Sequence, residues 1–234
     1  MTQTSVRENL LRIQERIAGA AARAGRSVEE ITLIGVSKTH PASAIREAFE
    51  AGVRHFGENR VQEWEGKRAG TEGLAAAWHL IGHLQSNKAA RAAKLFHSVD
   101  SVGDFGLAQK LDRARAEAGI TGKLRVLIEV RVAPEETKSG AEIAELPELA
   151  ESVAELPRLE LAGLMCIPPF LEEAERIRPY FRQLRELRDK LAGKLRLALP
   201  VLSIGMSHDF EVAIEEGATE VRVGSALFGA RDVK

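Results

Sequence analysis

The sequence predicts a single α/β domain over residues 1–234, a closed (β/α)8 TIM barrel preceded by one extra helix. Three observations support this. Short apolar segments alternate with helical segments, giving about eight strand–helix units after the N-terminal helix. The apolar segments lack strict alternation, which is typical of parallel strands covered on both faces. No Pro/Gly/Ser-rich linker divides the chain.

A doubly wound open sheet is the competing fold. It would usually carry a dinucleotide-binding glycine fingerprint or a Walker A loop after a strand, and neither motif follows any predicted strand. The barrel is therefore the favoured prediction.

The first helix covers residues 5–24, is closed by Gly25, and has apolar residues at helical spacing: Val6, Leu10, Ile13 and Ile17. Apolar, β-branched content predicts strands at 31–36, 53–56, 77–81, 97–99, 124–130, 159–165, 201–204 and 220–223. Helices are expected between them at 42–51, 58–68, 87–95, 106–118, 143–156, 172–197 and 210–216. Pro179 lies inside the segment 172–197, so this helix begins later or kinks there.

Composition excludes several classes of protein. Lys and Arg total 33 against 34 Asp and Glu, so the basic footprint of a general nucleic-acid binder is missing. No apolar run approaches the roughly 18 residues of a membrane span, and the N-terminus carries no apolar signal core. The only cysteine, Cys166, excludes an intramolecular disulfide and a multi-cysteine zinc site, and a buried structural thiol is expected there. We expect a cytoplasmic protein without a metal site.

Lys38 is the most informative residue. It ends the strand 31–36, and Pro41 prevents the strand from continuing. An ammonium group at a buried strand end is costly unless it is used. Desolvation favours the free amine of a lysine, and a free amine attacks aldehydes and ketones to form a Schiff base. The alternative is a lysine that simply reaches solvent at the end of its strand.

Two loops after the last two strands suit an anion, and in such barrels phosphate is often bound there. Ser207 is predicted as the N-cap of helix 210–216, with Gly205 allowing close backbone approach. Gly224 and Ser225 open a short helical turn whose free N–H groups would face an anion. Two ordinary capped helix starts are the alternative interpretation.

Arg222 lies inside the apolar strand 220–223 and needs an acceptor, either a carboxylate or a ligand atom with a lone pair. The first and last strands of a closed barrel are neighbours, so Lys38, Arg222 and the phosphate loops should converge. Pyridoxal 5'-phosphate (PLP) carries an aldehyde, a ring nitrogen and a phosphate, which would satisfy all three groups.

At this point the chain resembles the pyridoxal phosphate homeostasis proteins (the YggS/PROSC type), which are related to the N-terminal barrel of alanine racemase. The resemblance runs over nearly the whole chain and rests on ordered blocks at 35–39, 56–63, 78–88, 136–140, 163–165, 202–207 and 222–229. The family often has threonine where this chain has Ser225, and the hydroxyl is retained.

The resemblance implies a role for each site residue. Lys38 would form the internal aldimine with PLP. Ser207, Gly224 and Ser225 would hold the phosphate, with backbone help from residues 204–206. Arg222 would face the pyridine nitrogen. Asn59, His79 and Met206 would line the pocket.

Carrier and catalyst remain alternatives. Arginine would leave the ring nitrogen unprotonated, which weakens the electron sink, although racemases of the alanine type also place arginine there. Such racemases need a second base, usually a tyrosine, and the only tyrosine here, Tyr180, is predicted on an outer helix. The chain also ends soon after the last strand, so we expect no covering domain and a cofactor edge open to solvent.

We therefore expect a protein of intracellular vitamin B6 homeostasis that supplies PLP to apo-enzymes, without catalytic residues, as a monomer or weak dimer. A PLP-dependent amino-acid racemase or Schiff-base lyase is the alternative, and a cofactor-free barrel acting on a sugar phosphate is a third. Lys138, after the fifth strand, is either a second aldehyde-capturing site or a solvated loop lysine.

Overall fold

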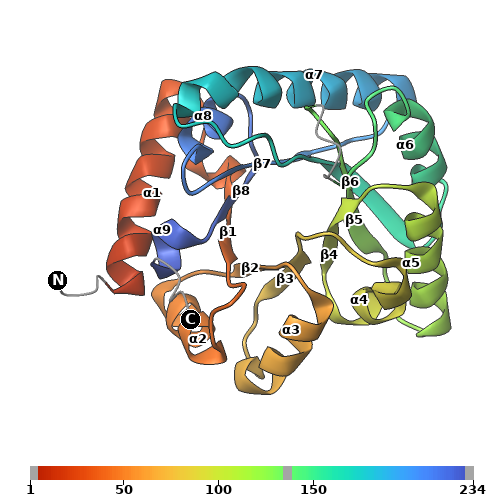
Figure 1. Cartoon of the computed structure of the whole chain (residues 1–234), viewed down its shortest axis with the longest axis horizontal. Helices are drawn as coiled ribbons and strands as arrows, with labels where there is room; N and C mark the ends of the chain where they lie inside the picture. The colour runs from red at the N-terminus through yellow and green to blue at the C-terminus, as the bar shows by residue number, and fades with distance from the viewer. Residues whose placement is uncertain (1–4, 134–138, 230–234) are drawn as a thin grey trace.

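Eight parallel strands form a closed barrel in the order β1 to β8, as a computed structural model that describes residues 5–133 and 139–229 shows. The strands form the inner ring of Figure 1, and the helices surround it. The strands are β1 Thr32–Val36, β2 His55–Glu58, β3 Ala77–Leu80, β4 Ser98–Val102, β5 Leu124–Glu129, β6 Leu159–Met165, β7 Val201–Met206 and β8 Glu220–Val223. The predicted barrel is confirmed.

The α-helices are α1 Val6–Arg23, α2 Ala42–Ala51, α3 Val61–Lys67, α4 Ala89–Leu95, α5 Phe105–Glu117, α6 Leu146–Ala154, α7 Arg178–Leu195, α8 Phe210–Glu215 and α9 Ser225–Phe228. None of the helices in the described parts of the chain combines the length and apolar character needed to cross a membrane.

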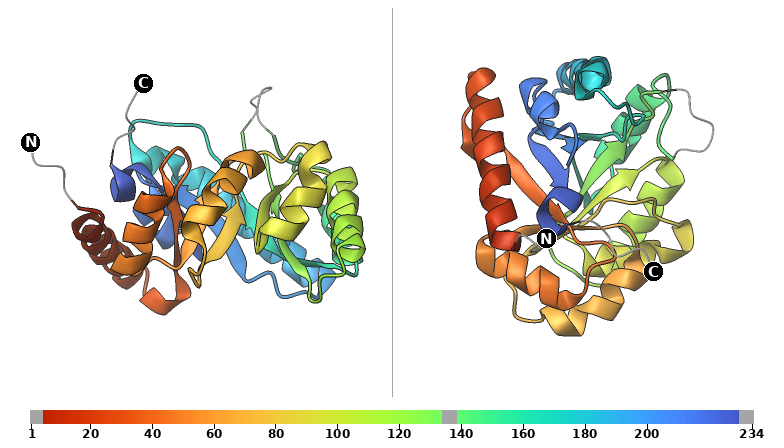
Figure 2. Two further views of the ribbon diagram at one scale, coloured as in Figure 1. Left: turned by 90° about the horizontal axis from the view of Figure 1, so that it is seen from below. Right: turned by 60° about the vertical axis from the view of Figure 1, so that its left-hand side comes forward.

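The extra helix α1 begins at a capping box, in which Ser5 and Glu8 satisfy each other's backbone N–H groups. It lies beside α8 and α9 on the outside of the barrel (Figure 2). The Asn9 side chain donates to the Leu227 carbonyl at 3.0 Å, and Arg16 pairs with Glu211 at 2.7 Å. The helix therefore covers the seam where the last strand–helix units meet the first.

The barrel closes by pairing β1 with β8, in a register that sets Ile34 against Arg222 and Gly35 against Val223. Gly224, directly after β8, packs closely on Val36, because a Cβ atom at Gly224 would lie 3.4 Å from the Val36 carbonyl oxygen. The end of β1 and the loop after β8 are therefore direct neighbours, as the sequence predicts.

Several predicted boundaries differ from the structure by a few residues, and two of these differences have a clear physical reason. The second strand was expected at 53–56 but covers His55–Glu58, so Glu58 is the last residue of β2 rather than the start of a helix. Its carboxylate is fully buried because Ser37 and Lys67 hydrogen-bond to it. The long helix begins later than residue 172, as the position of Pro179 indicates: a 3₁₀ turn, Ala174–Ile177, precedes α7, and Pro179 lies in the first turn of that helix.

The apolar core lies mainly between the strands and the surrounding helices, while the inside of the barrel is partly polar. Strand residues of alternating position point to opposite faces. Buried polar residues of the barrel strands include His79, Asp100, Glu129, Ser203, Glu220 and Arg222. These residues make the interior of the barrel polar.

Candidate ligand-binding site at the carboxyl end of the barrel

Lys38 stands in a turn at the carboxyl end of β1. The N–H of Ser37 donates to the Gly57 carbonyl at 3.0 Å, which extends the pairing of β1 and β2 by one residue. The Ser37 hydroxyl reaches Glu58 on the outer side of the strands at 2.7 Å. Lys38 follows Ser37 at this edge of the barrel, and it is half-buried.

The turn itself has an unusual backbone. The Ser37 carbonyl accepts the N–H of His40 at 3.1 Å, so Lys38 and Thr39 are the two central residues of a β-turn. Thr39 has a φ of 67°, in the left-handed region that a β-branched residue rarely adopts. The position of Lys38 therefore depends on a strained neighbour.

The loops after β7 and β8 are joined through Ser207. Its hydroxyl oxygen accepts the backbone N–H of Gly224 at 3.2 Å and that of Ala226 at 3.3 Å. Both bonds use oxygen lone pairs, which leaves the hydroxyl hydrogen available to an anion. Gly224 and Ser225 lie at the start of α9, as predicted, but the N–H of Gly224 is bonded to Ser207 and is not free.

Ser207 is not the N-cap of the following helix, so that prediction is wrong. The N-cap of α8 is Asp209, because the chain makes a further turn before the helix begins. The Asp209 carboxylate accepts the N–H of Met206 at 2.6 Å. Burial raises the pKa of Asp209, although this hydrogen bond and the charge of Arg222 oppose the shift.

A ring contact links the Lys38 turn to the loop after β8. The ring of His40 stacks on Phe228 of α9, with centroids 4.8 Å apart and planes 27° apart. The lysine turn and the start of α9 therefore belong to one packed unit at the same edge of the barrel.

Arg222 is 3% exposed, and its hydrogen-bond partners differ from both sequence alternatives. Its guanidinium donates to the Ser203 carbonyl at 2.7 Å, to the Ser203 hydroxyl at 2.8 Å and to the Cys166 carbonyl at 2.8 Å. A guanidinium has five N–H donors, so these bonds occupy three of them. Cys166 is buried, as expected.

The three remaining predicted residues lie in different surroundings. Asn59 follows β2 and is half-buried, and Met206 is the last residue of β7 and is also half-buried. His79 is 1% exposed and contacts two protein groups: its Nδ1 lies 3.3 Å from Asp100 and its Nε2 lies 3.0 Å from His55. His79 thus joins the polar interior of the barrel, and its predicted contact with a cofactor remains a prediction.

A groove of about 660 Å³ adjoins Asn59 between the loops that follow β2 and β3. Three of its lining residues, Arg60, His83 and Lys88, are basic, and none of its lining residues is acidic. Gly82 brings the two loops together, because a Cβ atom there would lie 2.5 Å from the Asn59 carbonyl oxygen.

Sequence reasoning missed a buried network inside the barrel. Arg125 on β5 pairs with Glu220 on β8, and the Ser98 hydroxyl donates to Asp100. Atoms of His79, Asp100 and Glu220 that could bind a metal lie within 4.8 Å of one another. His79 and Glu220 stand next to apolar residues on short strands, and Asp100 stands between Val99 and Ser101; such patterns also describe a solvent-exposed face.

The network shifts several ionisations. Burial, with the neighbouring His79, lowers the pKa of His55 to about 4. Burial opposes ionisation of Asp100, but its hydrogen bond with His79 and the attraction of that ring hold the pKa of Asp100 low. Burial and the nearby Asp100 raise the pKa of Glu220. The ionisable side chains that influence one another inside the barrel therefore come from several strands.

Glu129, the last residue of β5, was also missed. It is 5% exposed, and the Ser139 hydroxyl donates to its carboxylate at 3.0 Å. Burial raises the pKa of Glu129, against the opposing effects of Ser139 and of the Arg222 charge. A carboxylate at the end of an apolar strand is the signal that the sequence offered.

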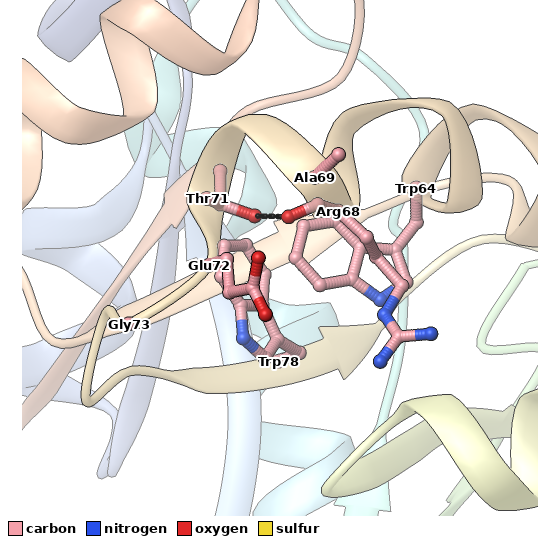
Figure 3. A pocket seen from close by; sticks show the side chains of 7 residues that line it. All are labelled: Trp64, Arg68, Ala69, Thr71, Glu72, Gly73 and Trp78. Carbon is pink, nitrogen blue, oxygen red and sulfur yellow. Dashed lines mark hydrogen bonds between the residues drawn. The ribbon is translucent and has the colours of Figure 1, made fainter.

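A second cavity, of about 410 Å³, lies between α3 and β3 (Figure 3). Trp64, Arg68, Thr71, Glu72 and Trp78 line it, and none of the predicted site residues does. Lys138 lies outside the described residues. Tyr180 is on α7, outside the barrel, where it packs against the core.

The comparisons with known proteins agree with the barrel fold. The sequence model of the family described as "Alanine racemase, N-terminal domain" matches residues 6–232. An alanine racemase from Clostridium difficile 630 shares the fold, with a TM-score of 0.76 over 98% of this chain and 58% of that one, at 16% identity. The class of protein is therefore an alanine racemase N-terminal barrel.

Two relatives narrow the class. The pyridoxal phosphate homeostasis protein of Aquifex aeolicus is 49% identical over 96% of this chain and 97% of its own length. PipY of Synechococcus elongatus PCC7942, solved with PLP bound, is 41% identical, with a TM-score of 0.82 over 93% of this chain and all of that one. The chain belongs to the pyridoxal phosphate homeostasis protein family.

Proposed function

We propose that this protein binds PLP through a Schiff base on Lys38 and acts in intracellular vitamin B6 homeostasis, supplying PLP to other proteins. The observation that carries the proposal is the position of the Lys38 turn, at the end of β1 and packed through His40 on Phe228 of α9, beside the loops joined by Ser207; from there the amine would reach the barrel mouth. The relatives support it, since PipY was solved with PLP and the Aquifex aeolicus protein is named for PLP homeostasis.

The residues at the mouth fit the three functional parts of PLP. The Lys38 nitrogen would bond to the aldehyde carbon, with loss of water. Ser207, Gly224 and Ser225 would bind the phosphate, together with the backbone of residues 204–206. Ser207 supports this because its hydroxyl hydrogen is not used by the two bonds its oxygen accepts.

The ring would lie over the interior residues. Arg222 keeps two N–H donors beyond its three bonds to Ser203 and Cys166, and one of them would serve the pyridine nitrogen. Asn59 and Met206, both half-buried at strand ends, would line the pocket. His79 would line the pocket from the polar interior of the barrel.

The site favours carriage of PLP over catalysis. Arg222 holds its proton at all physiological pH values, so it does not protonate the ring nitrogen and the electron sink stays weak; racemases of the alanine type share this arginine, so the tyrosine is the feature that separates the two functions. Tyr180, the tyrosine that a racemase of the alanine type would need, lies on the outer helix α7. We propose apo-forms of PLP-dependent enzymes as recipients, a cytoplasmic location, and a monomer or weak dimer.

The deciding experiment compares the wild type with Lys38→Ala. Wild-type protein incubated with PLP should develop a visible imine absorbance, and borohydride should fix PLP on the peptide that contains Lys38. Lys38→Ala should show neither, whereas Lys110→Ala, at an exposed position on α5, should match the wild type. An imine at full stoichiometry in Lys38→Ala would contradict the assignment and point to another lysine, Lys138 first.

Two further results would replace the proposed function. Exchange of α-protons of amino acids in deuterated water, at ordinary enzymatic rates, would establish the racemase or lyase alternative. A wild-type protein that stays colourless with PLP would favour a cofactor-free barrel.

A further inference from the structure

A largely buried lysine, Lys67, lies between two carboxylates directly behind the Lys38 turn. Its Nζ lies 3.0 and 3.1 Å from the two oxygens of Glu58 and 2.6 Å from Glu63. The Lys67 side chain is 11% exposed, and that of Glu58 is fully buried. Charged side chains that are largely shielded from water need partners of opposite charge, and these three residues are such partners for one another.

The same three residues bind the chain on both sides of Lys38. Glu58 accepts the Ser37 hydroxyl at 2.7 Å, and Lys67 donates to the Ser37 carbonyl at 2.8 Å. On the other side, Glu63 accepts the backbone N–H of Thr39. The residues before and after Lys38 are therefore both tied to one ion-paired group outside the barrel wall.

These bonds act where the backbone is strained. Thr39 has a φ of 67°, a conformation that usually calls for glycine or asparagine at this position of a turn. Such a conformation persists only where surrounding contacts hold it in place. The bond from the Thr39 N–H to Glu63 and the bonds to Ser37 are contacts of this kind.

Anchoring of α3 to the barrel would not require all of these contacts. The pairing of Lys67 with Glu58 is sufficient to join the end of α3 to β2. The bonds to the Ser37 carbonyl and the Thr39 N–H are additional, and both are made to the backbone of the lysine turn.

We propose that Glu58, Lys67 and Glu63 form a positioning cluster that holds the turn 37–40 in the conformation that brings the Lys38 amine into the barrel mouth. The inference rests on the proposed function, because it assigns to these residues the orientation of the amine that would bind PLP. None of the three is a catalytic residue.

The main test compares Glu63→Ala with Glu63→Gln. Glutamine keeps an oxygen that accepts the Thr39 N–H, whereas alanine removes the acceptor and remains a good helix former in α3. We expect Glu63→Ala to weaken PLP binding roughly threefold to tenfold, the effect of losing one hydrogen bond, and Glu63→Gln to stay close to the wild type. Equal affinities of Glu63→Ala, Glu63→Gln and the wild type would overturn the proposal.

A rescue variant separates positioning from general loss of stability. Glycine adopts a positive φ without strain, so Thr39→Gly should recover most of the affinity lost in Glu63→Ala. A general destabilisation by Glu63→Ala would not be repaired at Thr39. Absence of any recovery in the double variant would contradict the role of backbone strain.

Lys67 is tested by Lys67→Met and Lys67→Arg. Methionine leaves Glu58 without its cation, so circular dichroism must first show that this variant folds. Arginine keeps the charge and should restore binding in part. If Lys67→Met does not fold, the Glu63 series decides the proposal alone.

A readout without PLP distinguishes failure of this inference from failure of the proposed function. The apo-protein is treated with limiting acetic anhydride, and mass spectrometry compares acetylation of Lys38 with that of the exposed Lys110. The Lys38-to-Lys110 ratio should change in Glu63→Ala and not in Glu63→Gln, whether or not PLP binds. An unchanged ratio would contradict the positioning cluster, while an absent imine in the wild type would contradict only the proposed function.

Discussion

The hydroxyl oxygen of Ser207, after β7, accepts the backbone N–H of Gly224, after β8, at 3.2 Å. A second N–H, from Ala226, reaches the same oxygen at 3.3 Å. One side chain thus holds the two loops that are proposed to receive the phosphate, and it keeps a hydroxyl hydrogen for the ligand.

Ser207→Ala should therefore weaken the binding of PLP by about tenfold, because one donor to the phosphate is lost and two N–H groups lose their acceptor. Pyridoxal, which has the aldehyde but no phosphate, is the matched control ligand. Titrations followed by imine absorbance should show an unchanged pyridoxal affinity. An equal loss for both ligands would mean that Ser207 acts on the barrel and not on the phosphate.

Arg222→Ala should lower both the stability of the fold and the affinity for PLP. The substitution removes three hydrogen bonds and leaves buried acceptors on Ser203 and Cys166 without a donor, which should lower the free energy of unfolding by about 2–4 kcal/mol. Urea denaturation measures this loss, with Arg113→Ala, at a side chain that is 81% exposed, as the control. A variant as stable as the wild type would show that the three bonds contribute little.

Gly82→Ala should disturb the ligand site through Asn59. The new methyl group would meet the Asn59 carbonyl oxygen at 2.5 Å and its Cα at 2.8 Å, so the loop after β2 must move. We expect a several-fold loss of PLP affinity, measured by absorbance titration. Gly66→Ala is the matched control, because a Cβ atom at this position in α3 meets nothing within 4 Å.

That control carries its own expectation. Alanine is favoured over glycine inside a helix, so Gly66→Ala should raise stability by about 0.5–1 kcal/mol without changing PLP affinity. If Gly66→Ala lowered the PLP affinity as much as Gly82→Ala, the loss at Gly82 could not be assigned to movement of Asn59.

His55 should make the fold sensitive to mild acid. Its pKa is lowered from 6.5 to about 4, so between these pH values the unfolded chain binds a proton that the folded chain does not. The free energy of unfolding should fall as the pH falls from 6.5 to about 4, by about 1–3 kcal/mol, because His55 is only partly shielded from solvent.

Urea denaturation at a series of pH values measures this dependence. His55→Gln should make the slope in that window less steep than in the wild type, while His208→Gln, at an exposed histidine, should leave it intact. Burial also lowers the pKa of His97, which acts in the same direction, whereas buried carboxylates with raised pKa values, such as Glu129, act in the opposite one; the contribution of His55 is therefore the difference between the wild-type slope and that of His55→Gln. A wild-type slope in His55→Gln would contradict the assignment.

Local sequence patterns were sufficient to predict the barrel and the bounds of some of its helices and strands. The helix at 42–51 and the strands at 159–165 and 220–223 were predicted with the bounds that the structure has, because Gly52 and the apolar runs mark them unambiguously. Lys38 was predicted as the ligand-binding lysine in the same way, since an amine that follows a buried strand and precedes Pro41 stands out in the sequence alone.

Contacts between distant segments could not be predicted in this way. Ser207 was expected to cap the helix that follows it, yet its oxygen binds the loop after β8, because the start of α9 lies beside it. Arg222 was expected to meet a carboxylate or a ligand, and it meets carbonyl groups of β7 and of the residue after β6. In both cases the side chain bonds to groups from other segments of the barrel, and only the closure of the barrel brings those groups next to it.

The amino-acid sequence by itself determined the alternation of strands and helices, the family, and the lysine at the end of the first strand, since each is written in neighbouring residues. Only the tertiary structure decided that Glu58 is buried against Lys67, that Glu63 reaches the backbone of Thr39, and that His79 lies between His55 and Asp100. The physical reason is that a buried polar group takes its partners from segments that are distant along the chain, and those partners exist only once the barrel has closed.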